Sequence, residues 1–352
     1  MQFGLYAPVP HVTVGSPEIA RSVREAGGPL PDGVLDQQYE LSRDVLLAAD
    51  RAGFDIILFA ERHLGTDLEA WMLAAAIAPM TQQIRAMVAV HPGLWSPQLI
   101  AKMATTLDRM TPGRMAINLV TGWNVEEHRM FGGDTLPDSN DRYVRAEEFI
   151  DVVRGMWRQT PYSFKGRFFD VDAAQLLLKP ATATPPEIFT ASRSPRGLDM
   201  VARVADWWFL DFDKTARCTA EVEDSLRRSI DGMRERMSKL GRTVRFAFNP
   251  FIAFGPSRAV AEAEARRLLT PTEPDADIRK LENRIAPAMM AGCVGRPEDV
   301  RAQLAKYHAM GIELFLFKFP PTVGHVEEIA REVVVPLRTA DGVRPLAATS
   351  AI

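Results

Sequence analysis

The amino-acid sequence predicts an α/β protein, a (β/α)8 barrel with insertions, and three observations lead to this fold class. Eight short apolar or β-branched runs recur along the 352 residues, and helix-period sequence follows each of them. The runs are apolar throughout rather than alternating, as expected of parallel strands that are buried on both faces. No G-x-G-x-x-G follows the first run, which continues into Pro8-Val9-Pro10, so the sequence disfavours a doubly wound open sheet.

The predicted strands and helices alternate in chain order. The strands are expected at Gln2–Pro8, Phe54–Ala60, Ile84–Val90, Arg114–Val120, Glu187–Ala191, Asp206–Leu210, Thr243–Phe254 and Gly311–Phe319. Helices are expected at Leu35–Ala52, Leu68–Met80, Ser96–Met110, Asp141–Trp157, Ser257–Leu269, Gly295–Met310 and Val326–Leu337. Two further helices are expected, one that begins at Ser194 and another that ends at Leu240. Two of the expected helices begin with a cap and a proline, Ser96-Pro97 and Ser194-Pro195, and Gly53 offers the left-handed residue that commonly ends a helix.

The length fits one barrel with extra segments, because such barrels run to ~250–400 residues as a single domain. We therefore expect one domain over residues 1–340 and a C-terminal tail at 341–352. The insertions are predicted at about 12–34, 158–180 and 263–292. The second of these reads as a small hairpin, and Ala263–Met290 is the candidate lid.

Composition excludes several classes of protein. With 47% hydrophobic residues, 25% charged residues and a net charge of −3, the chain has neither a disordered composition nor a basic footprint for nucleic acid. The longest apolar run, Trp71–Met80, is half of the ~20 residues that a spanning helix needs, so no membrane segment is expected. The N-terminal sequence does not resemble a signal peptide, and Cys218 and Cys293 have no metal-type spacing, which favours the cytoplasm.

Polar side chains gather where the predicted strands end, and barrels carry their chemistry at these carboxyl ends. Three of the six histidines, His11, His63 and His91, lie at such positions. A single histidine there is commonly only a hydrogen-bonded structural residue, so proton transfer by any one of them is a hypothesis. No H-x-H or comparable ligand set follows a strand, and we predict no metal site.

The helix start at Ser192–Gly197 is compatible with two interpretations. Two serines, two arginines and the unpaired N–H groups of a helix N-terminus form a good phosphate cradle. The same residues could instead be a plain Ser-Pro cap. Aromatic residues near the strand ends favour a flat cofactor ring with a charged tail, although only one of the adjacent Trp207 and Trp208 can face the pocket.

Several long motifs resemble those of the bacterial-luciferase-like flavin-dependent monooxygenases. The segment from Met103 reads MATTLDRMTPGRMAINLVTGWNVEEHRMFGG and is followed by SNDRYVRAEEF. Further similar stretches are ADWWF, GRTVRFAFNPFIAF and VGRPEDV. Within the superfamily, the chain looks most similar to the alkanesulfonate, dimethylsulfone and pyrimidine monooxygenase branch.

This resemblance implies a homodimeric or homotetrameric enzyme that takes reduced FMN from a separate NAD(P)H:flavin reductase and passes oxygen from O2 through a flavin peroxide to a small molecule. The cofactor-binding residues expected from it and from the helix start are Phe59, Ala60, Asn118, Thr121, Glu127, Arg142, Tyr143, Ser192 and Ser194. The candidate catalytic residues are His11, His63, His91 and Asn118. The expected substrate pocket contains Asp67, Trp123, Trp208, Asn249, Phe251 and Lys318.

One departure from the family pattern bears on the substrate. Alkanesulfonate monooxygenases carry Arg-x-His on the seventh strand, where this sequence has Asn249 and Phe251. A sulfonate needs a fixed cation, so the change favours a neutral organosulfur compound and C–S cleavage, unless Arg62, Arg193 or Lys318 replaces the charge. Alternatives are heterocycle oxidation through a flavin N5 adduct, a deazaflavin-dependent oxidoreductase, and a flavin-binding protein without catalysis.

Overall fold

The computed structural model describes residues 1–9, 28–122, 124–131, 138–270 and 285–340. Eight parallel strands form a closed barrel in the order β1-β12-β9-β8-β7-β4-β3-β2, which confirms the predicted fold class. The barrel strands are β1 (Gln2–Tyr6), β2 (Ile56–Phe59), β3 (Arg85–Val90), β4 (Met115–Leu119), β7 (Glu187–Thr190), β8 (Trp207–Leu210), β9 (Arg245–Phe248) and β12 (Ile312–Phe317). The contacts between residues divide the chain into two compact units.

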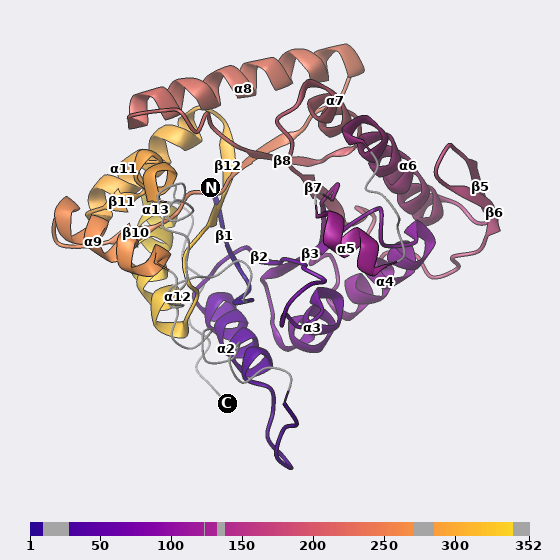
Figure 1. Ribbon diagram of the computed structural model, residues 1–352, viewed down its shortest axis with the longest axis horizontal. Helices are drawn as coiled ribbons and strands as arrows, with labels where there is room; N and C mark the ends of the chain where they lie inside the picture. The colour runs from indigo at the N-terminus through magenta and orange to yellow at the C-terminus, as the bar shows by residue number, and fades with distance from the viewer. Residues whose placement is uncertain (10–27, 123, 132–137, 271–284, 341–352) are drawn as a thin grey trace. The chain divides into compact units, whose positions relative to one another are not determined.

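The first unit comprises Met1–Ile84, Asp211–Ser229 and Phe246–Ile352. Within it β1 pairs with β2 and β12, and β12 pairs with β9, all in parallel. Gly4 allows β1 to fit here, because a Cβ atom at this position would lie 2.6 Å from Ile56 Cγ2 and 2.8 Å from both the Ile56 carbonyl oxygen and Leu316 Cδ1. Its helices are α2 (Gln37–Arg51), α3 (Ala70–Ile77), α9 (Arg258–Leu269), α11 (Pro297–Ala309), α12 (Val323–Ile329) and α13 (Val335–Ala340), with a π-helical turn at Ala330–Val334 (Figure 1).

The single strand expected at Thr243–Phe254 is wrong, because the structure contains two strands there. β9 ends at Phe248, and a short strand β10 (Ala253–Phe254) pairs in parallel with β11 (Val294–Gly295) outside the barrel. Pro250 lies in the break, and proline has no backbone N–H with which to continue a ladder. Its carbonyl oxygen instead accepts a hydrogen bond of 2.9 Å from the Lys318 backbone N–H.

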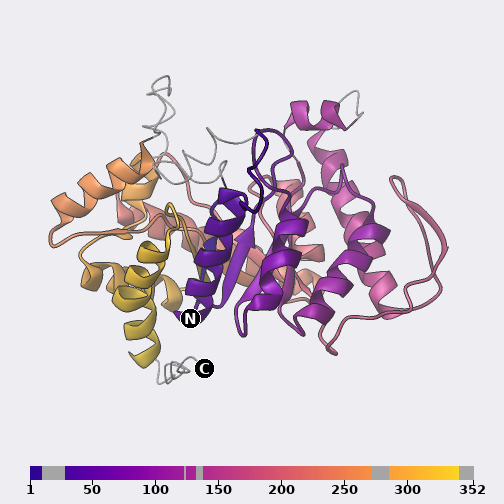
Figure 2. The same ribbon diagram turned by 90° about the horizontal axis from the view of Figure 1, so that it is seen from below.

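The second unit comprises Arg85–Leu210 and Ile230–Arg245. Its strands β3, β4, β7 and β8 pair in parallel in that order. The helices of this part are α4 (Pro97–Met110), α5 (Val125–Met130), α6 (Ser139–Arg158) and α7 (Pro195–Val204), and α8 (Thr219–Leu240) ends in it. The predicted hairpin is present as antiparallel β5 (Tyr162–Lys165) and β6 (Asp170–Ala174), and it projects beyond α6 (Figure 2).

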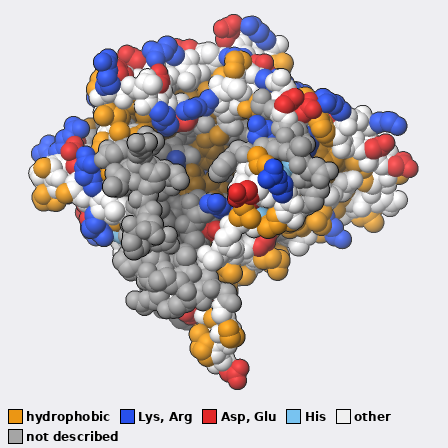
Figure 3. Space-filling model, viewed as in Figure 1, with side chains coloured by type: hydrophobic (Ala, Val, Ile, Leu, Met, Phe, Trp, Pro, Cys, Tyr) orange, Lys and Arg blue, Asp and Glu red, His pale blue; other side chains and the backbone are white. Residues whose placement is uncertain are grey.

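Charges of both signs are mixed on the surface, in line with the small net charge. Lys and Arg side chains alternate with Asp and Glu on the described part of the face shown in Figure 3. None of the described helices is long and apolar enough to cross a membrane.

Candidate functional site

Hydroxyl groups gather at the N-terminus of α7 in the second unit. Ser194 caps this helix, and its Oγ accepts a hydrogen bond of 3.2 Å from the Gly197 N–H. Ser194 Oγ also donates to the Tyr143 hydroxyl at 3.0 Å, and Ser192 Oγ donates to the same oxygen at 3.3 Å. The hydroxyl groups of Ser192 and Ser194, which follow β7, and that of Tyr143 on α6 therefore lie at the positive end of the α7 dipole.

The surroundings of this cluster fit a phosphate group. A Cβ atom on Gly197 would lie 1.8 Å from Ser192 Oγ and 2.8 Å from Tyr143 Cζ, so only glycine leaves room for the hydroxyl groups. Arg142, one residue before Tyr143 on α6, donates from its Nη1 to the Gly122 carbonyl oxygen. Its buried Nε has no hydrogen-bond partner in the described part of the chain. A positive helix end with hydroxyl groups beside it fits a phosphate ester, and Arg142 has a spare guanidinium donor.

The other predicted residues of the second unit lie on β4, directly after it, or on α5. Asn118 is half-buried on β4, in register with Phe189 of β7. Glu127, on the short helix α5, is buried with its Oε2 3.9 Å from His91 Nδ1. Thr121 follows β4 and is half-buried.

The two adjacent tryptophans of β8 point to different sides, as expected of neighbouring strand residues. Trp208 Nε1 donates to the Ser192 carbonyl oxygen at 3.3 Å, toward the hydroxyl cluster. Trp207 is fully buried, and its ring stacks on Phe189 with ring centres 5.2 Å apart. Trp208 is therefore the member of the pair that lies beside the predicted cofactor residues.

In the first unit, a buried acid and a histidine lie together after β2. Phe59 ends the strand and Ala60 follows it, and Glu61 Oε1 then lies 3.7 Å from His63 Nδ1. Glu61 Oε2 accepts a hydrogen bond of 2.9 Å from the Ala70 N–H at the start of α3. Burial raises the pKa of Glu61 to about 7. We did not predict Glu61 as a site residue, although an acid placed directly after a buried strand is a signal that could have found it.

A second polar group of this unit joins β1 to the end of β9. Asn249 Nδ2 donates to the Tyr6 hydroxyl at 3.0 Å. Asn249 Oδ1 is buried and has no hydrogen-bond partner among the described residues, so this amide has capacity for a ligand. Burial raises the pKa of the Tyr6 hydroxyl, which therefore stays protonated. The sequence did not predict Tyr6 as a site residue, because a tyrosine inside an apolar strand is expected to be a core residue.

Lys318 lies just beyond β12, and its main chain forms a bridge to Phe251. Lys318 is exposed as a residue. Desolvation of its ammonium group by neighbouring protein atoms lowers the pKa of that group, and the charge of Lys214 lowers it further. Asp67 is half-buried in the segment between β2 and α3. His11 and Trp123 lie outside the described residues.

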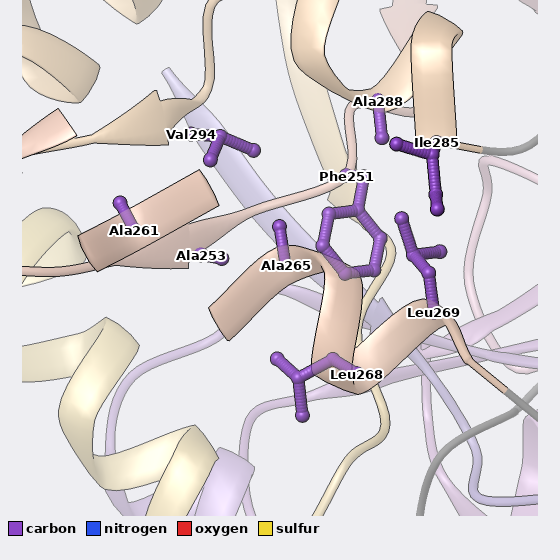
Figure 4. Close-up of a cluster of buried hydrophobic side chains, with 9 residues drawn as sticks. All are labelled: Phe251, Ala253, Ala261, Ala265, Leu268, Leu269, Ile285, Ala288 and Val294. Atoms are coloured by element: carbon purple, nitrogen blue, oxygen red, sulfur yellow. The ribbon is translucent and has the colours of Figure 1, made fainter. Parts of the chain in front are cut away.

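Phe251, which the sequence predicts in the substrate pocket, directly follows the break at Pro250. Its ring is buried in a hydrophobic cluster that also contains residues of α9, β10 and β11 (Figure 4). The members of this cluster are Phe251, Ala253, Ala261, Ala265, Leu268, Leu269, Ile285, Ala288 and Val294. Phe251 therefore lies between β9 and β10 rather than on one continuous seventh strand.

Replacing Phe251 by leucine tests this packing. Because the ring fills a cluster built largely from small side chains, we expect Phe251→Leu to lower the free energy of unfolding by about 1 kcal/mol. Urea unfolding of the purified variant measures the change. A variant as stable as the parent protein would contradict the packing role.

The part of the chain that the structure describes contains no group of three or more His, Cys, Asp or Glu side chains that could hold a metal ion. The candidate chemistry therefore consists of the hydroxyl cluster on α7, the His91–Glu127 and Glu61–His63 pairs, and the amide of Asn249.

Comparison with known proteins assigns the chain to a family. The family model described as luciferase-like monooxygenase matches residues 1–314. An FMNH2-dependent dimethylsulfone monooxygenase of Pseudomonas putida is 27% identical over 325 residues, which cover 84% of this chain and 87% of that protein. These matches agree with the resemblance drawn from the motifs between Met103 and Phe149.

Solved structures share the fold. DmoA from Hyphomicrobium sulfonivorans superimposes with a TM-score of 0.71 at 18% identity, covering 99% of this chain and 89% of that one. The EDTA monooxygenase EmoA from Chelativorans sp. BNC1 gives a TM-score of 0.74 at 19% identity, covering 99% and 96%. The chain therefore belongs to the luciferase-like monooxygenase family, a family of oxidoreductases.

Proposed function

We propose that the protein is a two-component monooxygenase that binds reduced FMN, uses O2 and oxidises a small, uncharged organosulfur compound. The observation that carries the cofactor assignment is the cluster of Ser192, Ser194 and Tyr143 hydroxyl groups around Gly197 at the N-terminus of α7. The name of the Pseudomonas putida relative supports both the reduced cofactor and the sulfone substrate. When bound, reduced FMN supplies the electrons with which one atom of O2 is transferred to the substrate and the other becomes water.

The residues of the chain divide the remaining work. The α7 cluster and Arg142 are proposed to hold the phosphate of the cofactor, while Asn118 and Thr121 are proposed to contact its ring. The Glu61–His63 and His91–Glu127 pairs are the proposed groups for moving a proton. Both pairs are buried, and burial serves such chemistry because activated oxygen is lost as hydrogen peroxide when water reaches it.

The preference for a neutral substrate rests on Asn249. Its side chain hydrogen-bonds to Tyr6 and keeps one polar atom unused, where alkanesulfonate enzymes carry a cation. The unused Oδ1 is an acceptor and cannot hydrogen-bond to a sulfone oxygen, but the second N–H of Nδ2 can donate to one, and a neutral amide does not neutralise a sulfonate. Lys318 is the residue that could reverse this preference, although its surroundings lower the pKa of its ammonium group.

The phosphate site is tested with Ser194→Ala, which removes a hydroxyl group from the cluster. We expect FMN to bind about tenfold more weakly, as measured by anaerobic titration, because one hydrogen bond to a charged group is lost. Ser257→Ala is the matched control, since Ser257 caps α9 in the same way, with its Oγ 3.4 Å from the Val260 nitrogen. Equal losses in both variants would show that the effect comes from helix capping rather than from a phosphate contact.

The reaction is tested by oxygen consumption with FMN, a generic flavin reductase and a panel of sulfones, sulfonates and pyrimidines. Turnover of a sulfone that requires the reductase is the expected result. Efficient turnover with NADH alone would contradict the two-component assignment, and oxidation of pyrimidines only would favour the heterocycle alternative. We further propose a homo-oligomer in the cytoplasm, and light scattering of the purified protein tests its oligomeric state.

A further inference from the structure

The second unit contains a pocket of about 850 Å³ that lies away from the hydroxyl cluster of α7. It opens around the amino ends of β7 and β8, where Glu187 and Asp206 lie, whereas the hydroxyl cluster follows the carboxyl end of β7. Arg203, in the last turn of α7, lines this pocket, and Ser194 caps the other end of the same helix. Ten residues of helix separate the two places by roughly 15 Å.

Arginines dominate the lining of this pocket, which we call the arginine pocket. Five of them line it: Arg154, Arg158, Arg203, Arg242 and Arg245. They face three carboxylates, those of Asp151, Glu187 and Asp206. Positive charge is therefore in excess among the lining residues.

The three carboxylates are already engaged. Asp206 Oδ2 accepts hydrogen bonds of 2.8 Å from Arg154 Nη2 and from the Ile188 N–H. Asp151 Oδ2 lies 2.6 Å from Arg203 Nη2. Glu187 is shared between Arg85 and Arg245. No carboxylate of the lining is left to neutralise the remaining arginines at close range.

Two arginines carry the unbalanced charge. Arg242 donates to the backbone carbonyl oxygens of Ala202 and Ala205 at 3.2 and 3.0 Å, and its nearest carboxylate oxygen, on Asp206, is 3.8 Å away. Burial lowers the pKa of Arg242, and repulsion from Arg154, Arg203 and Arg158 lowers it further. The Arg158 side chain makes no hydrogen bond or ion pair with any residue that the structure describes.

Helix dipoles account for only part of this arrangement. Arg158 and Arg203 lie in the last turns of α6 and α7, where cations are favoured. Each helix end carries only about half a negative charge, and Arg242, which lies on neither helix, has its nearest carboxylate oxygen 3.8 Å away. A bound anion would relieve the mutual repulsion of these arginines.

We propose that the arginine pocket binds an organic phosphate of nucleotide size. Guanidinium groups match the oxygens of a phosphate with paired hydrogen bonds, which favours phosphate over a simple halide. The volume exceeds that of an inorganic anion and falls within the ~300–1,000 Å³ typical of small-molecule sites. Tyr162, Pro185 and Pro186 add apolar surface to the lining, against which a ring can pack.

The test is calorimetric titration of the flavin-free protein with ADP, pyrophosphate and adenosine at matched ionic strength. We expect ADP and pyrophosphate to bind, ADP more tightly, and adenosine not to bind. Arg158→Gln should weaken ADP binding about tenfold, because one hydrogen bond to a charged group is lost. Arg228→Gln, which changes an exposed arginine of α8 outside the pocket lining, should leave the affinity within about twofold.

Ser194→Ala separates this pocket from the cluster on α7, because ADP could also contact that helix end. Its ADP affinity should equal that of the parent protein. Loss of ADP binding in Ser194→Ala but not in Arg158→Gln would overturn the proposal, as would heats of ADP binding no larger than those of sodium sulfate. Neither outcome depends on the oxygenase reaction, so the proposed function and this site can fail separately.

Discussion

Gly197→Ala is expected to weaken FMN binding about a hundredfold, because it affects several ligand contacts at once. The added methyl group would occupy the space of Ser192 Oγ, 1.8 Å away, and would press on the Tyr143 ring at 2.8 Å. Both hydroxyl groups must move, and the first turn of α7 then loses its close access to a phosphate. The displaced side chains also cost folding free energy, which the helix propensity of alanine, about 1 kcal/mol better than that of glycine, offsets in part, so we expect the protein to stay folded with a small change in the free energy of unfolding.

Anaerobic titration with FMN and urea unfolding measure the two effects separately. Gly232→Ala is the matched control, because Gly232 lies on α8 and the nearest atom to its added Cβ is Arg236 Nη1 at 3.7 Å. This control should gain the same helix propensity without any change in FMN affinity. If Gly197→Ala binds FMN as tightly as the parent protein, the cofactor phosphate does not lie at α7.

Glu61→Gln is expected to stabilise the protein at pH 8 by about 3 kcal/mol and to have little effect near pH 4. Burial raises the pKa of Glu61 from 4.5 to about 7. Between these pH values the unfolded chain releases the proton while the folded protein keeps it, so the stability of the parent protein falls as pH rises. Glutamine does not ionise, and its amide oxygen can still accept from the Ala70 N–H.

Urea unfolding at a series of pH values measures this difference, which should grow from about pH 4.5 to pH 7 and then remain constant. Glu235→Gln is the control: this exposed residue pairs with Lys239, which lowers the pKa of its carboxyl group, so no gain at pH 8 is expected. A pH-independent difference for Glu61→Gln would mean that Glu61 is not held protonated.

The same variant tests the proposed proton transfer. Glu61 lies beside His63 and is proposed to act through it, so its loss should shift the pH profile of kcat/KM rather than only lower its height. Unchanged pH dependence would assign Glu61 a structural role at the start of α3. A stability gain combined with lost activity would mark Glu61 as a residue kept for function at a cost in stability.

Much of the barrel could be predicted from the sequence because its signals are local. Apolar runs mark buried parallel strands, and Ser96-Pro97 and Ser194-Pro195 mark helix starts that the structure confirms. The hydroxyl cluster was also within reach, because Ser192 and Ser194 lie at the start of a helix. Tyr143 entered only through the family motif, since its contact with Ser194 joins residues that are 51 positions apart.

The sequence by itself determined the fold class, the family and the capped helix start at Ser194-Pro195, all of which depend on periodicity, caps and contiguous motifs. Only the tertiary structure decided that Phe251 leaves the barrel, that Glu61 is buried beside His63, and that Asn249 meets Tyr6. The place of Phe251 depends on the direction of the chain after the break at Pro250, and the raised pKa of Glu61 depends on the exclusion of water from its carboxyl group. Both arise from packing between distant segments, and no local pattern of residues encodes them.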